Sequence, residues 1–305
     1  MRIKILVVFL GLIFCGLGIY LICNVETRHT TSQQEINPQS VYENVLAVPP
    51  VPDNIEFCGE KVPQHLYWVK EGLDRELINH CYNHSRTLMT LKRSTRFFPI
   101  IEKILKEENV PLDLKYLCVA ESNLENVVSP AKAAGFWQFM EPTGKNYGLE
   151  INENVDERYH LEKATRAACK HLKKLKEQFG NWALAAAAYN MGENGLSKRL
   201  NEQQLNNYWD LFLNDETSRY VYRCIAYKLV FENQELYNIR LTSMDFYKPF
   251  DYKEIVITKS IEDLRTYCTE NKILYRQLKE LNPWLRSTKL IVPANKSYTL
   301  KVPEK

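Results

Sequence analysis

The sequence predicts a mainly helical protein that ends in a small module of mixed α and β structure. Between residues 69 and 231, apolar side chains recur at the three- and four-residue spacing of amphipathic helices. After Pro249 the pattern changes to shorter runs, some alternating and some helical. These runs follow the order strand, helix, helix, strand, over residues 253–258, 261–270, 274–281 and 290–302.

The composition is that of a folded chain without a dominant charge. Apolar residues make up 45% and charged residues 25% of the 305 positions, which is enough to build a core. Forty Lys and Arg against 37 Asp and Glu leave a formal charge of +3. This balance excludes proteins whose affinity comes from a strong basic field, so no nucleic-acid partner is expected. Neutral and mildly acidic substrates remain compatible.

The N-terminal residues 1–23 predict a membrane anchor or a signal segment. Arg2 and Lys4 precede an uncharged, mostly apolar run over 5–23, which as a helix would span about 28 Å. The large residues 20–22 do not suit a signal cleavage site, which favours an uncleaved anchor. In either case the positive-inside rule predicts export to the periplasm. Residues 24–65 follow as a polar and then Pro-rich linker.

Helical patterns continue through the next 170 residues or so. An N-terminal helical extension over 66–95 precedes a larger domain over 96–240. Gly180 ends a long amphipathic helix, and Asn181 is placed to cap the alanine-rich helix that follows. The helices expected in the larger domain lie at 111–122, 161–179, 182–190 and 217–231.

The eight cysteines give no sign of a metal site, because no C-x-x-C pair or zinc-type Cys/His spacing occurs. Neither a metal nor another cofactor is therefore expected. Cys118, Cys169 and Cys224 fall within apolar helical patterns, which favours buried free thiols. A disulfide between Cys58 and Cys81 remains an open alternative.

One carboxylate occupies an unusual position. In the predicted helix 111–122, Glu121 continues the apolar face formed by Leu114, Leu117 and Cys118, and it lies near the helix C-terminus. Burial and the negative end of the helix both raise the pKa of a carboxyl group. A protonated acid near neutral pH is what cleavage of a glycosidic bond requires. A buried structural Glu paired with Lys or Arg is an equally compatible interpretation.

Motifs around and after Glu121 decide between these interpretations. Glu121-Ser122-Asn123 is followed by Ser129-Pro130 and by Ala-Gly-Phe-Trp-Gln-Phe-Met at 134–140. This ordered set resembles the catalytic domain of the soluble lytic transglycosylases, relatives of goose-type lysozyme, over about residues 96–230. The remaining motifs are Tyr-Gly-Leu at 147–149, Ala-Ala-Tyr-Asn-Met-Gly-Glu at 187–193 and Glu-Thr-Ser-Arg-Tyr-Val at 216–221.

The resemblance implies a lysozyme-like helical fold and an enzyme that cleaves the β-1,4 bond between N-acetylmuramic acid and N-acetylglucosamine in peptidoglycan. Glu121 would be the single catalytic acid and base. The residues implied to bind the glycan strand are Ser129, Gln138, Met140, Tyr189, Asn190, Glu216 and Tyr220. Among them, the resemblance implies that Gln138 supplies amide hydrogen bonds and that Tyr189 orients Glu121 or the acetamido group of the sugar.

Local explanations exist for several of these positions. Ser129 is suited to cap a turn before Pro130, Met140 to fill a core, Tyr189 to pack at a helix junction and Glu216 to cap a helix. At the level of function, a lysozyme-like hydrolase and a non-catalytic cell-wall binding protein remain the alternatives.

The C-terminal residues 250–305 resemble a degenerate LysM module, a small β-α-α-β unit that binds N-acetylglucosamine chains. The resemblance rests on Leu278, on Leu-Asn-Pro at 281–283 and on the paired terminal strands. The usual Gly-Asp-Thr-Leu turn is replaced by Thr-Lys-Ser-Ile at 258–261. The resemblance therefore predicts the module's fold more firmly than its sugar binding.

Overall fold

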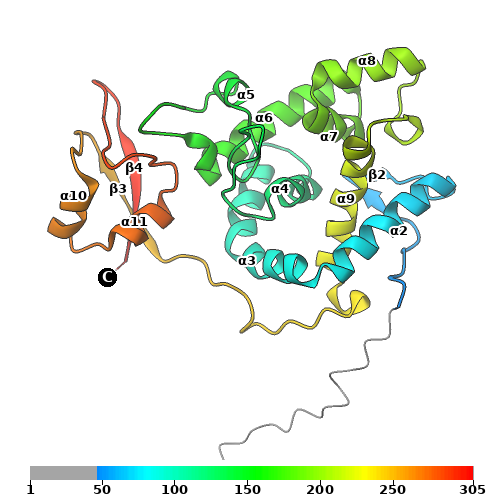
Figure 1. Cartoon of the computed structure of the whole chain (residues 1–305), viewed down its shortest axis with the longest axis horizontal. Helices are drawn as coiled ribbons and strands as arrows, with labels where there is room; N and C mark the ends of the chain where they lie inside the picture. Colours follow the sequence, from blue (N-terminus) through cyan, green and yellow to red (C-terminus); the bar gives the residue numbers. More distant parts are fainter. Residues whose placement is uncertain (1–46, 305) are drawn as a thin grey trace, which may run out of the picture. The chain divides into compact units, whose positions relative to one another are not determined.

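The short helix α4 (Lys115–Ser122) lies among longer helices in the helical part of the chain (Figure 1). Tyr116, Leu117, Cys118 and Val119 are all buried, so α4 is apolar around most of its circumference, as expected of a core helix. Helices α3 and α9 pack against it. The structure is a computed structural model, and it describes residues 47–304.

The predicted fold class is confirmed, since helices dominate up to residue 237 and a module of two strands and two short helices follows. The helices of the first part are α2 (Tyr67–Tyr82), α3 (His84–Glu107), α4, α5 (Glu141–Asn146), α6 (Leu161–Phe179), α7 (Trp182–Met191), α8 (Glu193–Gln203) and α9 (Asp215–Glu232). Short 3-10 turns lie between them: η2 (Leu112–Leu114), η3 (Glu157–Tyr159), η4 (Tyr208–Asp210) and η5 (Gln234–Tyr237).

The junction of α6 and α7 has the predicted form. Gly180, with φ +89°, ends α6, and the Asn181 side chain accepts a hydrogen bond from the Leu184 amide at 2.8 Å. The alanines of α7 at 183 and 185–188 are buried, and α6 and α9 both pack against this helix. Small side chains allow close approach of helices, so α6 and α9 can both lie close to α7.

Two helix starts in the helical part of the chain differ from the sequence prediction. The helix predicted from residue 111 begins instead as the 3-10 turn η2, and regular α-helix starts at Lys115. Helix α9 begins at Asp215, two residues earlier than predicted, because the Asn214 side chain accepts a hydrogen bond from the Thr217 amide at 2.8 Å. Asn214 rather than Glu216 is therefore the cap of this helix.

Part of the segment predicted as a linker is folded. β1 (Glu56–Phe57) and β2 (Glu60–Lys61) form a small antiparallel hairpin. Ile55, Phe57 and Val62 are buried in the main helical core. The hairpin is held by Asp113, which accepts hydrogen bonds from the Cys58 amide at 2.7 Å and from Lys228 at 2.8 Å.

The C-terminal module contains β3 (Tyr252–Ile257), α10 (Leu264–Glu270), α11 (Tyr275–Leu281) and β4 (Tyr298–Pro303). β3 and β4 pair antiparallel from Tyr252 opposite Pro303 to Ile257 opposite Tyr298. Of the strand predicted over 290–302, only the end forms the ladder, and Leu290 makes an isolated bridge with Ile261. The module core also includes Val155 and Tyr159 of the helical part.

All six cysteines within residues 47–304 are free thiols, including Cys58 and Cys81. The open disulfide alternative is therefore not realised. Within the same residues, no helix is long and apolar enough to cross a membrane. The predicted anchor over 5–23 lies outside the described part of the chain.

Candidate active site

Glu121 lies in the last turn of α4, where the sequence places it, and its side chain is half-buried. The Tyr220 hydroxyl on α9 donates a hydrogen bond of 2.6 Å to Oε1 of Glu121. Tyr220 itself is only 1% exposed, so its position is fixed by the core. Two helices that pack together thus fix the direction of the Glu121 carboxyl group.

The surroundings of Glu121 move its pKa close to neutral pH, so that a substantial fraction of the carboxyl group is protonated there. Burial raises its pKa to about 7, and the charge of Glu216 pushes in the same direction. The hydrogen bond from Tyr220 and the positive charge of Arg223 act the opposite way. Because Arg223 forms no ion pair with Glu121, the interpretation of Glu121 as a structural ion-pair partner is not supported.

Four of the predicted binding residues line one pocket of about 600 Å³. Met140 is 43% exposed there, so it is not core filler. His171, Tyr147 and Thr143 add further aromatic and polar wall to the pocket. The four predicted residues are Gln138, Met140, Tyr189 and Asn190. We call this the groove pocket.

Gln138 uses its amide differently from the expectation. Its Nε2 donates to the carbonyls of Val127 at 3.0 Å and Gly135 at 2.8 Å, so both amide protons form hydrogen bonds within the loop and hold its backbone. Its backbone has φ +47°, the left-handed region. The Oε1 atom is the polar group of this side chain left as a hydrogen-bond acceptor.

Tyr189 was expected to orient Glu121 or the acetamido group of the substrate. Its hydroxyl instead donates to the Trp137 carbonyl at 2.7 Å. Tyr220 therefore orients Glu121, while Tyr189 ties α7 to the loop that carries Gln138. The neighbouring Asn190 accepts a hydrogen bond from the Thr217 hydroxyl at 2.8 Å, which links α7 to the start of α9.

Ser129 takes the local role of closing a turn, whereas Glu216 forms an ion pair on the surface. The Ser129 hydroxyl accepts a hydrogen bond from the Ala133 amide at 3.0 Å and so closes the turn after Pro130. The Glu216 side chain is 63% exposed and pairs with Arg223 at 3.1 Å. Neither residue is among those that line the groove pocket.

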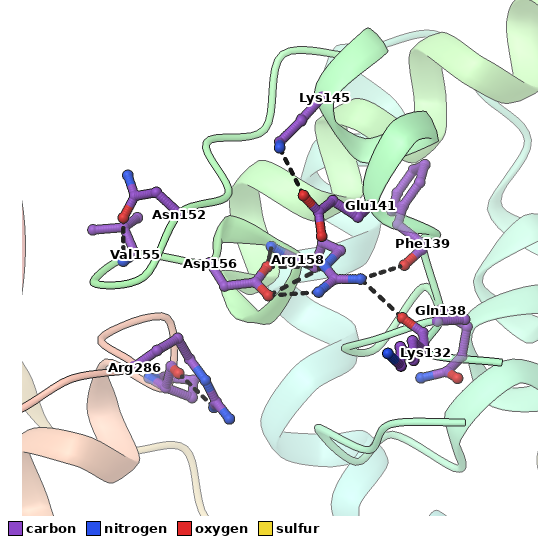
Figure 2. A network of polar contacts seen from close by, with 12 residues as sticks. Lys132, Gln138, Phe139, Glu141, Lys145, Asn152, Val155, Asp156, Arg158 and Arg286 are labelled. Atoms are coloured by element: carbon purple, nitrogen blue, oxygen red, sulfur yellow. Dashed lines mark hydrogen bonds and ion pairs between the residues drawn. The ribbon is translucent and has the colours of Figure 1, made fainter. Parts of the chain in front are cut away.

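The loop that carries Gln138 and Met140 is fixed by a buried ion pair (Figure 2). Arg158 binds Asp156 through Nε and Nη2, at distances of 2.7–3.2 Å, and both residues are less than 10% exposed. Nη1 of Arg158 donates to the carbonyls of Lys132 at 3.0 Å and Phe139 at 3.2 Å. One guanidinium thus connects both ends of this loop to η3.

Gly135 is required at the closest approach of this loop. It has φ +81°, and a Cβ atom added there would lie 1.9 Å from the Arg158 carbonyl oxygen. No side chain fits that space without movement of the backbone. The Gly in the Ala-Gly-Phe-Trp motif is therefore explained by contact between two main-chain segments.

One residue of the groove pocket, His171, could not be predicted from the sequence. His171 stands between Tyr147 and Tyr189, with ring centroids 4.7 and 5.2 Å away. Burial lowers the pKa of His171 to about 4, so this ring is neutral at physiological pH. In the sequence, His171 is one more residue of an amphipathic helix, with no signal of its own.

Within residues 47–304, no cluster of three His, Cys, Asp or Glu side chains is arranged to hold a metal ion.

Two family models match the chain over separate ranges. Residues 98–212 match the family model of the transglycosylase SLT domain. Residues 253–305 match that of the soluble lytic transglycosylase C-terminal LysM-like domain. Along the chain, the two matches are therefore first to an SLT domain and then to a LysM-like domain. The SLT match includes Glu121 and the residues of the groove pocket, while α2, residues 84–97 of α3, and α9 lie outside it.

Among curated proteins, the chain is similar to membrane-bound lytic murein transglycosylase D of Escherichia coli, from strains K12 and O6:H1. The identity is 33% over 183 residues, which is 58% of this chain and 40% of the relative. The chain therefore covers less than half the length of these relatives.

Among solved structures, similarity is found to the 70 kDa soluble lytic transglycosylase of Escherichia coli, with 15% identity and a TM-score of 0.40. That match covers 64% of this chain and 34% of the other. The lytic transglycosylase Slt of Pseudomonas aeruginosa gives 19% identity and a TM-score of 0.36, with 50% and 26% of the two chains covered.

Gly135→Ala is expected to lower the free energy of unfolding by more than about 3 kcal/mol, because backbone strain adds to a main-chain clash. Gly148→Ala is the matched control: it has a similar φ of +87° but open space around the added methyl group. That variant should lose about 1 kcal/mol. Urea unfolding of both proteins tests this, and equal losses would show that the contact with Arg158 imposes no constraint.

Glu121→Gln is expected to be more stable than the wild type at pH 8 but not at pH 4. Glu121 has its pKa raised from 4.5 to about 7 on folding, so the folded wild type loses stability as the pH rises through this window. Gln cannot ionise and avoids that loss, which we put at about 2 kcal/mol for a half-buried group. Thermal or urea unfolding from pH 4 to pH 8 measures the free energy of unfolding of both proteins. If the difference between these free energies does not change with pH, the raised pKa of Glu121 is contradicted.

Proposed function

We propose that this protein is a peptidoglycan lytic transglycosylase that cleaves the β-1,4 bond between N-acetylmuramic acid and N-acetylglucosamine without net use of water. The observation that carries the proposal is a half-buried Glu121 with a pKa of about 7, close enough to Tyr189 of the groove pocket for the two groups to interact electrostatically. The predicted binding residues that line this pocket are neutral, and Glu121 itself is not among the lining residues. The SLT match over 98–212 and the similarity to lytic murein transglycosylase D support the substrate class.

A second carboxylate would be needed by a glycosidase that uses an enzyme nucleophile or a general base for water. Two carboxylates are candidates for this role: Glu216, which acts electrostatically on Glu121, and Glu193, which lines the groove pocket. Both already form ion pairs, Glu216 with Arg223 and Glu193 with Lys174, each at 3.1 Å. Gln138, Tyr189 and Asn190 supply no charge. This arrangement favours a mechanism in which the substrate provides the nucleophiles.

In the proposed first step, protonated Glu121 gives its proton to the glycosidic oxygen as the bond to C1 of the muramyl sugar breaks. The 2-acetamido oxygen of the same sugar stabilises the positive charge that develops at C1. Glu121 is then a carboxylate, and the hydrogen bond from Tyr220 stabilises that ionised form.

In the second step, ionised Glu121 takes the proton of the sugar's own 6-hydroxyl group, and O6 forms a bond to C1. The product is a 1,6-anhydromuramyl end, and Glu121 is again protonated. The reaction gains from proximity, because well-oriented groups in one molecule reach effective molarities of roughly 10⁵ M or more.

The apolar run at 5–23 and the name of the membrane-bound relative support export to the periplasm with attachment to a membrane. The glycan strands of the cell wall would then be the macromolecular partner. The LysM-like module would add a second contact to the same polymer.

The decisive experiment is digestion of purified sacculi with the full-length protein, followed by mass spectrometry of the released muropeptides. We expect 1,6-anhydro ends, and Glu121→Gln should lower the rate at least about 100-fold because it cannot donate a proton. Glu202→Gln, which changes a surface carboxylate paired with Arg199, should keep the wild-type rate. Products heavier by one water would indicate a lysozyme-like hydrolase, and no products at all would favour a non-catalytic wall-binding protein.

Tyr220→Phe is expected to move the descending limb of the pH–rate profile to higher pH. The rate falls as Glu121 ionises, and loss of the Tyr220 hydrogen bond raises the pKa of Glu121 further. Tyr189→Phe is the control, because the Tyr189 hydroxyl bonds the Trp137 carbonyl and not Glu121. A shift of the Tyr220→Phe profile to lower pH, or equal shifts in both variants, would contradict the assigned role of Tyr220.

A further inference from the structure

A second pocket, of about 620 Å³, also borders α4. Ala120 and Asn123, the residues one before and two after Glu121, form part of its wall. The rest comes from α2, the start of α3 and α9, all outside the SLT match. We call it the arginine pocket, after Arg86, Arg219 and Arg223.

The charge of the arginine pocket is positive. Glu76 is the one carboxylate among its described lining residues, and it is only 1% exposed. Arg219 bonds it at 2.7 Å, so the negative charge is held inside the wall. His80 also lines the pocket, but burial lowers its pKa to about 4, so it adds no charge at neutral pH.

The three arginines differ in how far their charge is already matched. Arg219 and Arg223 also reach Asp215 at 3.6 Å and Glu216 at 3.1 Å, in the first turn of α9. Arg86 is exposed, and its side chain has no hydrogen bond or ion pair to any residue in the described part of the chain. Its guanidinium is therefore available to a carboxylate that enters from solvent.

Amide groups flank Arg86 in the pocket. Asn79 and Asn83, near the end of α2, are both exposed and line the same space. Asn123 completes this set, and its Oδ1 accepts a hydrogen bond from Tyr227 at 2.9 Å. A guanidinium together with several amides suits a ligand that has carboxylates and peptide groups rather than hydroxyls alone.

We propose that the arginine pocket binds the short acidic peptide that the muramyl sugar of peptidoglycan carries. The inference rests on the proposed function, because it assigns a substrate group to a place beside Glu121. The peptide is attached to the 3-O lactyl group of the sugar whose C1 bond is cleaved. It therefore leaves the glycan within one sugar of Glu121, where Ala120 and Asn123 begin the pocket wall.

Binding of soluble saccharides by calorimetry tests the proposal with the full-length protein. The background is Glu121→Gln, so that no ligand is consumed. The two ligands are a muramyl-containing tetrasaccharide with its acidic peptides and the same tetrasaccharide after removal of the peptides by an amidase. We expect the peptide-bearing ligand to bind more tightly, and added salt should reduce that advantage.

Arg86→Gln in this background should weaken binding of the peptide-bearing ligand about fivefold and leave the stripped ligand unchanged. Arg86→Lys keeps the charge and should recover part of the loss. Arg199→Gln is the matched control, because this exposed arginine on α8 pairs with Glu202 and does not line the pocket. Its affinity for both ligands should equal that of the background.

Equal affinity for the two ligands, or an equal loss for both in Arg86→Gln, would overturn the proposal. The proposed function has a separate outcome in the sacculus digestion. If sacculi are not cleaved while Arg86 still distinguishes the ligands, the pocket stands and the enzymatic function fails. If sacculi are cleaved without such a distinction, the enzymatic function stands and the pocket assignment fails.

Discussion

The burial of the Glu121 carboxyl group is the constraint on which the rest of the site depends. A carboxyl group on the apolar face of a core helix is expensive to ionise, and that cost moves its pKa to about 7. The Tyr220 hydroxyl limits the cost by bonding the ionised form. The folded state thus gives up stability near neutral pH in exchange for an acid that can release and recover a proton, as the proposed two-step mechanism needs.

The walls around this acid are fixed by contacts that do not involve a substrate. Arg158 joins both ends of the loop that carries Gln138, and the Tyr189 hydroxyl ties α7 to the Trp137 carbonyl. Gly135 permits the close approach on which the loop depends. Side chains held in this way lose little freedom when a ligand binds, so the site is largely organised in advance.

Charge is distributed unevenly around Glu121. The predicted binding residues of the groove pocket, Gln138, Tyr189 and Asn190, are neutral. The arginine pocket is lined by three arginines, and its carboxylate, Glu76, is buried. A peptidoglycan strand has the same division, since its sugars are largely neutral and its peptides are acidic. This correspondence connects the proposed reaction with the proposed recognition of the peptide.

The sequence by itself determined the fold class, the limits of α6 and the position of Glu121 on an apolar helix face. These features depend on periodicity and on local caps such as Gly180 and Asn181, which act within a few residues. Ordered motifs likewise indicated Gln138, Met140 and Tyr189 as neighbours in one site. The tertiary structure alone decided which groups each of these side chains contacts.

The hydrogen bond from Tyr220 to Glu121 joins residues that are 99 positions apart in the sequence. The Tyr189 hydroxyl donates to the Trp137 carbonyl and not to Glu121. Helix propensity and spacing carry no information about such pairs. The hairpin at 56–61 and the arginine pocket are decided in the same way, because each depends on segments that meet only after the helices have packed. Local sequence preferences therefore determine that Glu121 lies on an apolar helix face. Long-range packing determines its hydrogen-bond partner, its pKa and the pockets near it.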